Sequence, residues 1–412
     1  MKIINGTIIN PELNKMYKAD IEVKSPAGSK EEGLVIDASG LYIAPGMADT
    51  HVHFRDPGFT YKEDILTGAR AAAKGGYTEI VLMANTNPKV DNLDTLSYVI
   101  EKGKDTGIHI STCANVTMGM KGEEIVPMEE LKEHGAVGFT DDGVPIMDSS
   151  VCLEAMKRSA QLGVPISFHE ENPSFIDNNG VNRGKASEYY GIGGSPREAE
   201  IDLIARDIEL AKKASPRVVI QHISTKEGVE LVRQAKKDGL DIHAEATPHH
   251  FSLTEDAVIK YGTNAKMNPP LRTEEDRMAV IEGLKDGTID LIATDHAPHS
   301  AEEKAKSILD APSGIIGLET CLSLAIKNLV NENHLTYPQL FNRLSLAPCE
   351  LYGLKGGKID DQLNLDLVIF DPDATWVVSE FESKSSNSPF TGEKLPGVIK
   401  YTICGGRIVY EG

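Results

Sequence analysis

Short apolar runs alternate with longer amphipathic segments over most of the chain. The eight runs cover residues 41–54, 78–84, 109–115, 136–140, 164–169, 217–222, 241–246 and 290–294. The segments between them are helix-like, and the one that starts at Ser195 offers an N-cap, Pro196 for the first turn and Glu198 for a capping box. Strands that alternate with helices in this way predict an α/β fold, a (β/α)8 barrel of the TIM type. We expect its active site at the carboxyl ends of the strands.

The two ends of the chain are richer in turns and have shorter strand-like runs. Residues 3–9 have the pattern of a strand, an Asn5-Gly6 turn and a second strand, which predicts a β-hairpin. Residues 367–370 and 401–410 have a similar strand pattern. Because a short hairpin is marginally stable without partners, we expect the two ends of the chain to pair with each other.

The length of the chain allows more than one domain. At 412 residues it exceeds a typical single domain, but one barrel and a small second module would fit. We therefore predict a small β-sandwich-like domain from residues 1–45 and 355–412, and a catalytic barrel domain from residues 46–354. The hydrophobic fraction of 40% and the charged fraction of 25% are ordinary for a globular protein.

Composition argues against several kinds of partner and location. The formal net charge of −20 disfavours nucleic acid or an anionic membrane surface as a partner. There is no long uncharged apolar run and no basic leader with a cleavage site, so the sequence predicts neither a membrane span nor a secretory signal. The five cysteines are scattered and lack a C-x-x-C pair, which indicates free thiols in a reducing cytoplasm.

Polar residues mark the ends of the apolar runs selectively. At the ends of six of the eight runs lie His51 and His53, Asn85, Asp141 and Asp142, His169, His222, and Asp295 and His296. Residues two apart on a strand point to the same side, so His51 and His53 can converge on one ion. One such residue alone would indicate only a satisfied polar group, whereas the position shared by all of them indicates a common site.

The residue types in this set favour metal chemistry. Four of these histidines and two of the aspartates would supply the nitrogen and oxygen donors that suit zinc or a similar divalent ion. Six side chains are too many for one tetrahedral site, but they suffice for two ions if a carboxylate and a solvent oxygen bridge them. Two such ions can activate water and polarise a carbonyl together. The sequence therefore predicts metal-assisted attack on an amide or ester-like carbon.

Five motifs carry a resemblance to a known family: HVHFRDPG at residues 51–58, MANT at 83–86, FTDDG at 139–143, NPPLR at 268–272 and ATDHAPH at 293–299. On these motifs the chain resembles the dihydroorotases of the amidohydrolase superfamily, specifically the class I type found as a stand-alone bacterial enzyme. The resemblance covers nearly the whole length. The first and last motifs are shared with other cyclic amidases, whereas Arg55 and Asn85 point more specifically to dihydroorotases.

The resemblance implies a ligand set with two Zn²⁺ ions per subunit. Its members would be His51, His53 and Asp295 for one ion, His169 and His222 for the other, and Asp142 as the bridge between them. Many superfamily members bridge with a carboxylated lysine, but the fourth run ends in aspartates instead. The residues alone leave open whether Asp141 or Asp142 bridges, and the family pattern favours Asp142. A turn-capping or supporting carboxylate is the alternative role for Asp141.

The resemblance also implies the reaction, the reversible cyclisation of N-carbamoyl-L-aspartate to L-dihydroorotate and water. This is the third step of de novo pyrimidine (UMP) biosynthesis. Asp295 would be the catalytic residue that carries a proton between water and the ring nitrogen. A carboxylate close to a dication has a lowered pKa and can therefore act as a base.

Selection of this substrate requires cations and hydrogen-bond donors around its free carboxylate. Arg55 has a planar fork suited to a carboxylate, although in isolation it could equally form a surface salt bridge. The family pattern adds His53, Asn85, Asn268, His299 and the backbone of Ser313 and Gly314. Asn268 could instead begin a turn. Ser313 departs from the bulkier apolar residue expected there, so only its backbone role is carried over.

Other readings of the sequence remain open. The chain could be another cyclic amidase, such as an allantoinase or a hydantoinase, although Arg55 and the missing bridging lysine argue against this. It could also be a non-catalytic homologue that serves as a scaffold for aspartate carbamoyltransferase. Such a homologue is expected to lose metal ligands, and all six candidates are present. We expect a homodimer and a possible association with aspartate carbamoyltransferase.

Overall fold

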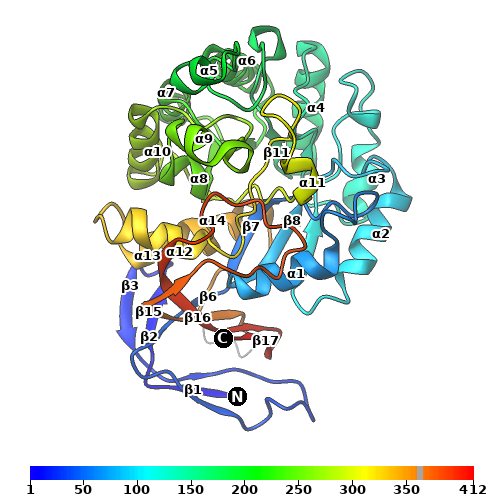
Figure 1. The fold of residues 1–412 in the computed structure, drawn as a ribbon. Coiled ribbons are helices and arrows are strands. Elements are labelled where there is room, and N and C mark those ends of the chain that lie inside the picture. The colour runs from blue at the N-terminus through cyan, green and yellow to red at the C-terminus, as the bar shows by residue number, and fades with distance from the viewer. Residues whose placement is uncertain (360–364) are drawn as a thin grey trace.

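The structure is a computed structural model that describes residues 1–359 and 365–412, and a barrel of parallel strands lies at its centre (Figure 1). The barrel strands are β7 (Met47–Val52), β8 (Tyr77–Leu82), β9 (His109–Thr112), β10 (Phe139–Thr140), β11 (Ile166–Phe168), β12 (Val218–Ile220), β13 (Ile242–Ala246) and β14 (Leu291–Ile292). Parallel pairing runs from β7 to β9 and from β10 to β14. Isolated bridges from Ala114 to Phe139 and from Val52 to His296 close the two seams. The barrel that the apolar runs predict is confirmed.

Helices lie around the outside of the strand barrel (Figure 1). They are α1 (Ile65–Lys74), α2 (Leu93–Gly103), α3 (Met128–Glu133), α4 (Ser149–Leu162), α5 (Lys185–Tyr190), α6 (Glu198–Ala214), α7 (Lys226–Lys237), α8 (Pro248–Ser252), α9 (Asp256–Tyr261), α10 (Glu274–Asp286), α11 (Ala301–Lys304), α12 (Cys321–Ala325), α13 (Tyr337–Phe341) and α14 (Ala347–Tyr352). Short helical turns are η1 (Met118–Met120), η2 (Pro173–Phe175), η3 (Gly262–Ala265), η4 (Ile326–Val330) and η5 (Asn342–Leu346). Among the described residues, no helix is long and apolar enough to cross a membrane.

Local sequence explains where most of these helices start. In α7, the Thr225 side chain accepts a hydrogen bond from the Gly228 amide, and Val229 and Val232 form part of its buried stripe. The expected cap of α6 is wrong, because that helix begins at Glu198 and Ser195 lies outside its first turn. The Ser195 hydroxyl instead donates to Glu171, 3.0 Å away.

Strands from both ends of the chain share one six-stranded sheet, with the order β17-β16-β15-β6-β2-β3. These strands are β2 (Thr7–Asn10), β3 (Lys15–Lys18), β6 (Tyr42–Pro45), β15 (Leu367–Val377), β16 (Lys394–Cys404) and β17 (Arg407–Glu411). A second sheet contains β1 (Lys2–Ile4), β4 (Ile21–Glu22) and β5 (Val35–Asp37). Buried Ile3 and Ile36 of the smaller sheet pack with Ile43 and Leu367 of the larger one. The two ends of the chain therefore do pair, as a two-sheet module.

The predicted hairpin at residues 3–9 is wrong. β1 and β2 do not pair with each other, because the chain passes from one sheet to the other between them. Asn5 has a φ of 64° and its side chain donates to Asp37 across the smaller sheet. A Cβ at Gly6 would lie 2.3 Å from the Cδ1 of Ile43. The Asn-Gly pair thus allows the chain to cross tightly between the two sheets and to pack closely against Ile43. An Asn-Gly pair also favours a hairpin turn, so the local sequence alone does not distinguish the two structures.

The first apolar run is divided between the two parts of the molecule. β6 belongs to the terminal sheet and β7 to the barrel, and only Gly46 separates them. The Gly46 amide donates to the Asp366 carbonyl, and a Cβ there would lie 2.1 Å from the Thr78 hydroxyl. This close crossing joins the terminal sheet rigidly to the barrel strand that ends near His51.

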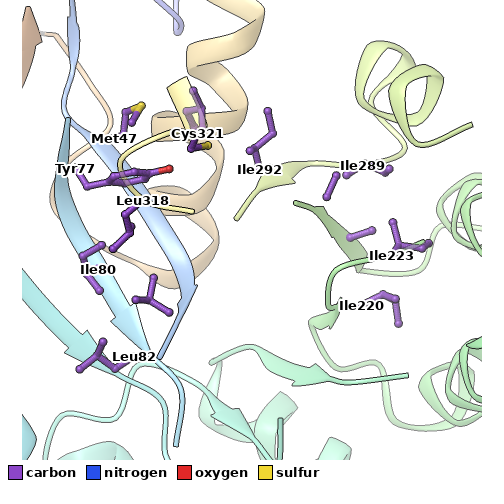
Figure 2. Close-up of a cluster of buried hydrophobic side chains, with 14 of the residues drawn as sticks. Met47, Tyr77, Ile80, Leu82, Ile220, Ile223, Ile289, Ile292, Leu318 and Cys321 are labelled. Carbon is purple, nitrogen blue, oxygen red and sulfur yellow. The ribbon is translucent and has the colours of Figure 1, made fainter. Parts of the chain in front are cut away.

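Apolar side chains fill the space between the barrel strands and the helices. Figure 2 shows Met47 and Tyr77, from neighbouring strands, beside Leu318 and Cys321, which lead into α12. All four side chains are fully buried. Truncating such a residue to alanine typically costs about 2–5 kcal/mol, so this packing strongly fixes the position of β7.

Candidate active site

The predicted metal ligands lie together at the carboxyl ends of the barrel strands. His51 is inside β7 near its end, and His169 directly follows β11. Asp142, His222 and Asp295 follow β10, β12 and β14 within a few residues. The side chains of these residues and of His53 are at most 7% exposed. Residues that are far apart in sequence thus form one buried cluster.

Asp142 occupies the middle of this cluster. Its Oδ1 lies 3.4 Å from the Nε2 of His51, and its Oδ2 lies 3.4 Å from the Nε2 of His53. The same Oδ1 lies 3.8 Å from the Nδ1 of His169 and 3.8 Å from the Nε2 of His222. One carboxylate therefore faces four imidazoles, an arrangement that suits a bridge between two ions.

Asp295 and the remaining imidazole pair complete the cluster. The Oδ1 of Asp295 lies 3.0 Å from the Nε2 of His53 and 3.5 Å from that of His51. On the other side of the cluster, the Nδ1 of His169 lies 3.0 Å from the Nε2 of His222. Donor atoms of His51, His53 and Asp295 lie within 4.8 Å of one another, as do those of His51, Asp142 and His222.

Outward hydrogen bonds fix three of the four rings. The contacts are His51 Nδ1 to Glu245 Oε2 at 2.9 Å, His169 Nε2 to Glu171 Oε2 at 3.1 Å, and His53 Nδ1 to Asn85 Oδ1 at 3.1 Å. If each outward nitrogen donates, the inward nitrogen presents a lone pair to the cluster. The inward Nε2 of His51 is buried and has no hydrogen-bond partner among the described residues. A buried ring nitrogen without a partner, beside two carboxylates, fits a divalent metal ion.

The two adjacent aspartates after β10 have different surroundings. Asp141 accepts hydrogen bonds from the backbone amides of Val116 and Thr117, from the Thr117 hydroxyl, and from the Asn115 amide at 3.3 Å. These contacts anchor the loop after β9 and direct the Asp141 carboxylate away from the histidines. Only Asp142 faces the imidazoles, which supports the family pattern over the alternative that the sequence left open.

Charge in the cluster favours the ionised form of both inner aspartates. Burial opposes ionisation of Asp142, but His51 and His222 outweigh it and hold the pKa of Asp142 well below its usual value. Burial of Asp295 is likewise outweighed by His51 and His53, which lower its pKa to about 2. Both side chains are therefore carboxylates at neutral pH, as metal ligation and proton acceptance require.

The backbone is strained at three residues of the site. Arg55, His222 and Asp295 have φ angles of 59°, 34° and 46°, in a region that non-glycine residues rarely adopt. Each lies just beyond a barrel strand, where the chain turns outward. Such strain is retained where the surrounding structure fixes a side chain in one direction, so it supports a functional role for these positions.

A cavity of about 200 Å³ opens above the cluster. It is lined by the cluster residues other than His51 and by Arg55, Asn85, Asn268, His299 and Ser313, among others. The structure therefore brings the predicted substrate-binding side chains to one cavity. Its size suits a small molecule, and its lining is dominated by polar groups.

Arg55 is a cation that points into this cavity. Its Nε donates to the Pro298 carbonyl at 3.3 Å, and its guanidinium lies 3.4 Å from the Nε2 of His299. Among the described residues it forms no ion pair, so the surface salt bridge is not observed. His299 donates to the Ser313 carbonyl at 2.9 Å and lies 3.3 Å from the Nζ of Lys62. Burial, Arg55 and Lys62 lower the pKa of His299 far below its usual range, so His299 is neutral.

The other predicted substrate-binding residues differ in whether their polar atoms already have hydrogen-bond partners. The Asn268 Oδ1 is buried and has no partner among the described residues, so it is free to bind a ligand. Asn85 uses both ends of its amide within the cluster, since its Nδ2 also donates to Asp142 at 3.1 Å. The Gly314 amide donates to the Lys266 carbonyl at 2.9 Å. The main chain of Gly314 is therefore occupied in this conformation, and of the two residues Ser313 lines the cavity, so the expected ring-amide contact stays a prediction.

Two supporting carboxylates were not identified from the sequence. Glu245 lies near the end of the short strand β13, and a charged residue in a buried strand is itself a signal that could have been used. Glu171 lies two residues after His169, in a loop without a recognisable pattern. His250 bonds Thr247 and Pro269 and is structural, whereas the Nε2 of buried His249 has no partner in the described parts of the chain.

Comparisons with known proteins agree with this geometry. A family model described as dihydro-orotase-like matches residues 40–228. A dihydroorotase of Clostridioides difficile (strain 630) is 52% identical over 99% of both chains, and one of Clostridium acetobutylicum is 50% identical over 99% of both chains. Among solved structures, an L-hydantoinase from Arthrobacter aurescens has a TM-score of 0.87 at 27% identity, covering 100% of this chain and 96% of its own.

Proposed function

The chain belongs to the dihydroorotase family, and from this membership we propose that the cluster around Asp142 is its metal-dependent catalytic centre. As a dihydroorotase, the protein is a cyclic amide hydrolase that interconverts N-carbamoyl-L-aspartate with L-dihydroorotate and water in pyrimidine biosynthesis. The observation that carries the placement of the site is the position of Asp142, within 3.8 Å of nitrogen atoms from four histidines.

The donor set supports two zinc ions in this centre. His51, His53 and Asp295 would hold one ion, His169 and His222 the other, and Asp142 would contact both. Bound zinc supplies Lewis acidity, which polarises the scissile carbonyl and lowers the pKa of water. Glu245 and Glu171 would keep the rings of His51 and His169 oriented and raise their basicity as ligands.

Asp295 is the proton carrier in this proposal. It is ionised at neutral pH, and its Oδ1 faces His53. In ring closure it accepts the proton that the carbamoyl nitrogen loses when that nitrogen attacks the protonated side-chain carboxyl, and it returns this proton to the hydroxyl that leaves the carboxyl carbon as water. In ring opening it takes a proton from water and delivers it to the departing ring nitrogen. General acid–base catalysis of this kind typically contributes about 10²- to 10⁴-fold to the rate.

Arg55 and Asn268 orient the substrate. The guanidinium of Arg55 has no carboxylate partner among the described residues, and it would bind the free α-carboxylate through two parallel hydrogen bonds. The unpartnered amide oxygen of Asn268 would accept a hydrogen bond from a ring or carbamoyl N–H. His299 positions the Ser313 carbonyl beside them. These groups favour a substrate with a carboxylate over the neutral rings of hydantoin and allantoin.

A substrate panel tests this assignment. Purified protein is assayed with L-dihydroorotate, N-carbamoyl-L-aspartate, hydantoin and allantoin, before and after treatment with a chelator and after zinc is restored. We expect turnover of the first two compounds only, loss of turnover with the chelator, and recovery with zinc. Comparable hydantoin turnover would refute the substrate assignment, and chelator-resistant activity would refute the metal assignment.

The remaining expectations concern the protein as a whole. The protein acts on a small molecule, and we propose that it works in the cytoplasm as a homodimer. Sedimentation of the purified protein alone and with aspartate carbamoyltransferase tests both the dimer and an association between the two enzymes. The domain division at residues 45/46 and 354/355 also stays a prediction.

A further inference from the structure

A second cluster of potential metal ligands lies at the other end of the barrel. His109 is the first residue of β9, Cys404 is the last residue of β16, and Asp366 immediately precedes β15. The Nε2 of His109 lies 2.9 Å from the Oδ2 of Asp366. One donor atom from each of the three residues lies within 4.8 Å of the other two. A thiol, an imidazole and a carboxylate therefore meet where the terminal sheet contacts the amino end of the barrel.

The cluster borders a cavity that contains a further buried carboxylate. This cavity has a volume of about 580 Å³, and Glu79, His109 and Cys404 are among its lining residues. Glu79 is only 3% exposed, and the Gly356 backbone donates a hydrogen bond to its carboxylate. Glu79 and His109 are direct partners in the parallel pairing of β8 and β9, so their side chains leave the sheet on the same side. A buried carboxylate that has no cationic partner is costly unless it takes up a proton or binds a cation, so a cation next to Glu79 would be stabilised.

We propose that Cys404, His109 and Asp366, beside the buried carboxylate of Glu79, form a binding site for a thiophilic divalent metal ion, for which Zn²⁺ is the best match. Thiolate, imidazole and carboxylate are the donors that zinc accepts in tetrahedral sites, whereas Mg²⁺ and Ca²⁺ take oxygen ligands. The Cys404 thiol now faces the Thr78 carbonyl at 3.9 Å, and it releases its proton to solvent when the metal binds.

The position of the site assigns it a structural role. Of its three ligands, His109 comes from the barrel strand β9, whereas Asp366 and Cys404 come from the terminal sheet, just before β15 and at the end of β16. The Gly405 amide already holds the Asp366 carboxylate, at 2.7 Å from its Oδ1. A bound ion would therefore cross-link the terminal sheet to the barrel, far from the carboxyl-end cavity where catalysis takes place.

Cobalt distinguishes this site from the catalytic centre. Metal-stripped full-length protein is titrated with Co²⁺ to saturation and its absorption spectrum is recorded. The candidate catalytic ligands are all nitrogen or oxygen donors, so a sulfur-to-cobalt charge-transfer band can arise only at a cysteine site. We expect this band in the wild-type protein, together with one cobalt equivalent more than in Cys404→Ser. Thermal unfolding temperature should also rise with added zinc in the wild type, beyond the rise seen in Cys404→Ser.

Matched variants separate this proposal from its alternatives. Cys321→Ser, another buried cysteine substitution, should keep the band, as its thiol lies beside Tyr77 and not in the cluster. His109→Gln alters a side chain that is 44% exposed, and it should weaken cobalt binding at the thiol site at least tenfold. If folded, cobalt-saturated wild type shows no thiolate band, then His109 and Asp366 form an ion pair only and the proposal is overturned. A band that survives Cys404→Ser and disappears in Cys349→Ser, the other thiol near Glu79, also overturns it.

Discussion

Substituting Arg55 by lysine tests the proposed recognition of the substrate carboxylate. The change keeps one positive charge at the cavity but removes the planar fork that two parallel hydrogen bonds require. It also removes the Nε donor that bonds the Pro298 carbonyl at 3.3 Å and holds the side chain in place. Turnover of bound substrate should change little, because Arg55 faces the part of the substrate that does not react.

The expected size of the effect follows from the contacts that are lost. A hydrogen bond to a charged group contributes about 1.5–3 kcal/mol, and lysine would lose one of two such bonds to the carboxylate. With about 1.4 kcal/mol for each factor of ten, dihydroorotate affinity should fall on the order of 10- to 100-fold. The loss should appear mainly in KM, because Arg55 contacts a part of the substrate that does not react. The retained positive charge keeps the loss from being larger.

Steady-state kinetics in both directions and equilibrium binding of dihydroorotate measure this effect. Arg70→Lys is a matched control, because Arg70 is exposed and its contact to Glu382 is a surface ion pair at 3.6 Å. That control should leave KM and kcat unchanged. Unaltered dihydroorotate affinity in Arg55→Lys would show that the carboxylate binds elsewhere and would remove Arg55 from the substrate site.

Three further changes test other parts of the reasoning. Glu245→Gln keeps a hydrogen-bond acceptor for His51 but removes the negative charge of the glutamate. Metal affinity, measured by competition with a chelator, should then fall about 10- to 100-fold. An unchanged affinity would contradict the supporting role of Glu245. Asp295→Ala should retain most of the zinc, measured by elemental analysis, but lose turnover in both directions by at least about 10²-fold, and retained activity would exclude Asp295 as proton carrier. Burial lowers the pKa of Lys304 to about 7, so between roughly pH 7 and 10 the unfolded chain binds one more proton than the folded chain. The free energy of unfolding should therefore rise with pH in this window, by at most about 1.4 kcal/mol per pH unit. Urea titrations at several pH values measure this rise. Lys304→Met should remove it, whereas Lys306→Met, at an exposed position, should leave it unchanged.

The strand pattern of the barrel was predictable because it is local. A strand that is buried on both faces requires a short apolar run, and eight such runs separated by helical segments fit few other folds. Closure then places the carboxyl ends of all strands around one mouth, which brings His51 and Asp295 together although the sequence separates them widely. The ligand cluster could therefore be proposed from residue types and from their place after each strand.

Features that depend on distant contacts were not predictable. Ser195 has the ideal residue type for a helix cap, but its hydroxyl bonds Glu171, which the local sequence cannot reveal. Asn5-Gly6 fits a hairpin turn equally well as a crossing between sheets, and the choice depends on packing against Ile43. In both cases a local preference is overridden by tertiary structure, where the free energy of packing is larger than that of a single turn or cap.

The choice between Asp141 and Asp142 shows why neighbouring residues with identical chemistry can be separated only in three dimensions. Both follow β10, and successive side chains at a strand end point in opposite directions, so only one can reach the barrel mouth. Asp141 is held by amides of Val116 and Thr117 in the preceding loop, which leaves its neighbour to face the imidazoles. Asp141→Asn should therefore loosen that loop and lower stability while metal affinity stays close to wild type. Asp142→Asn should do the reverse, and equal effects of the two changes on metal binding would contradict the division of roles.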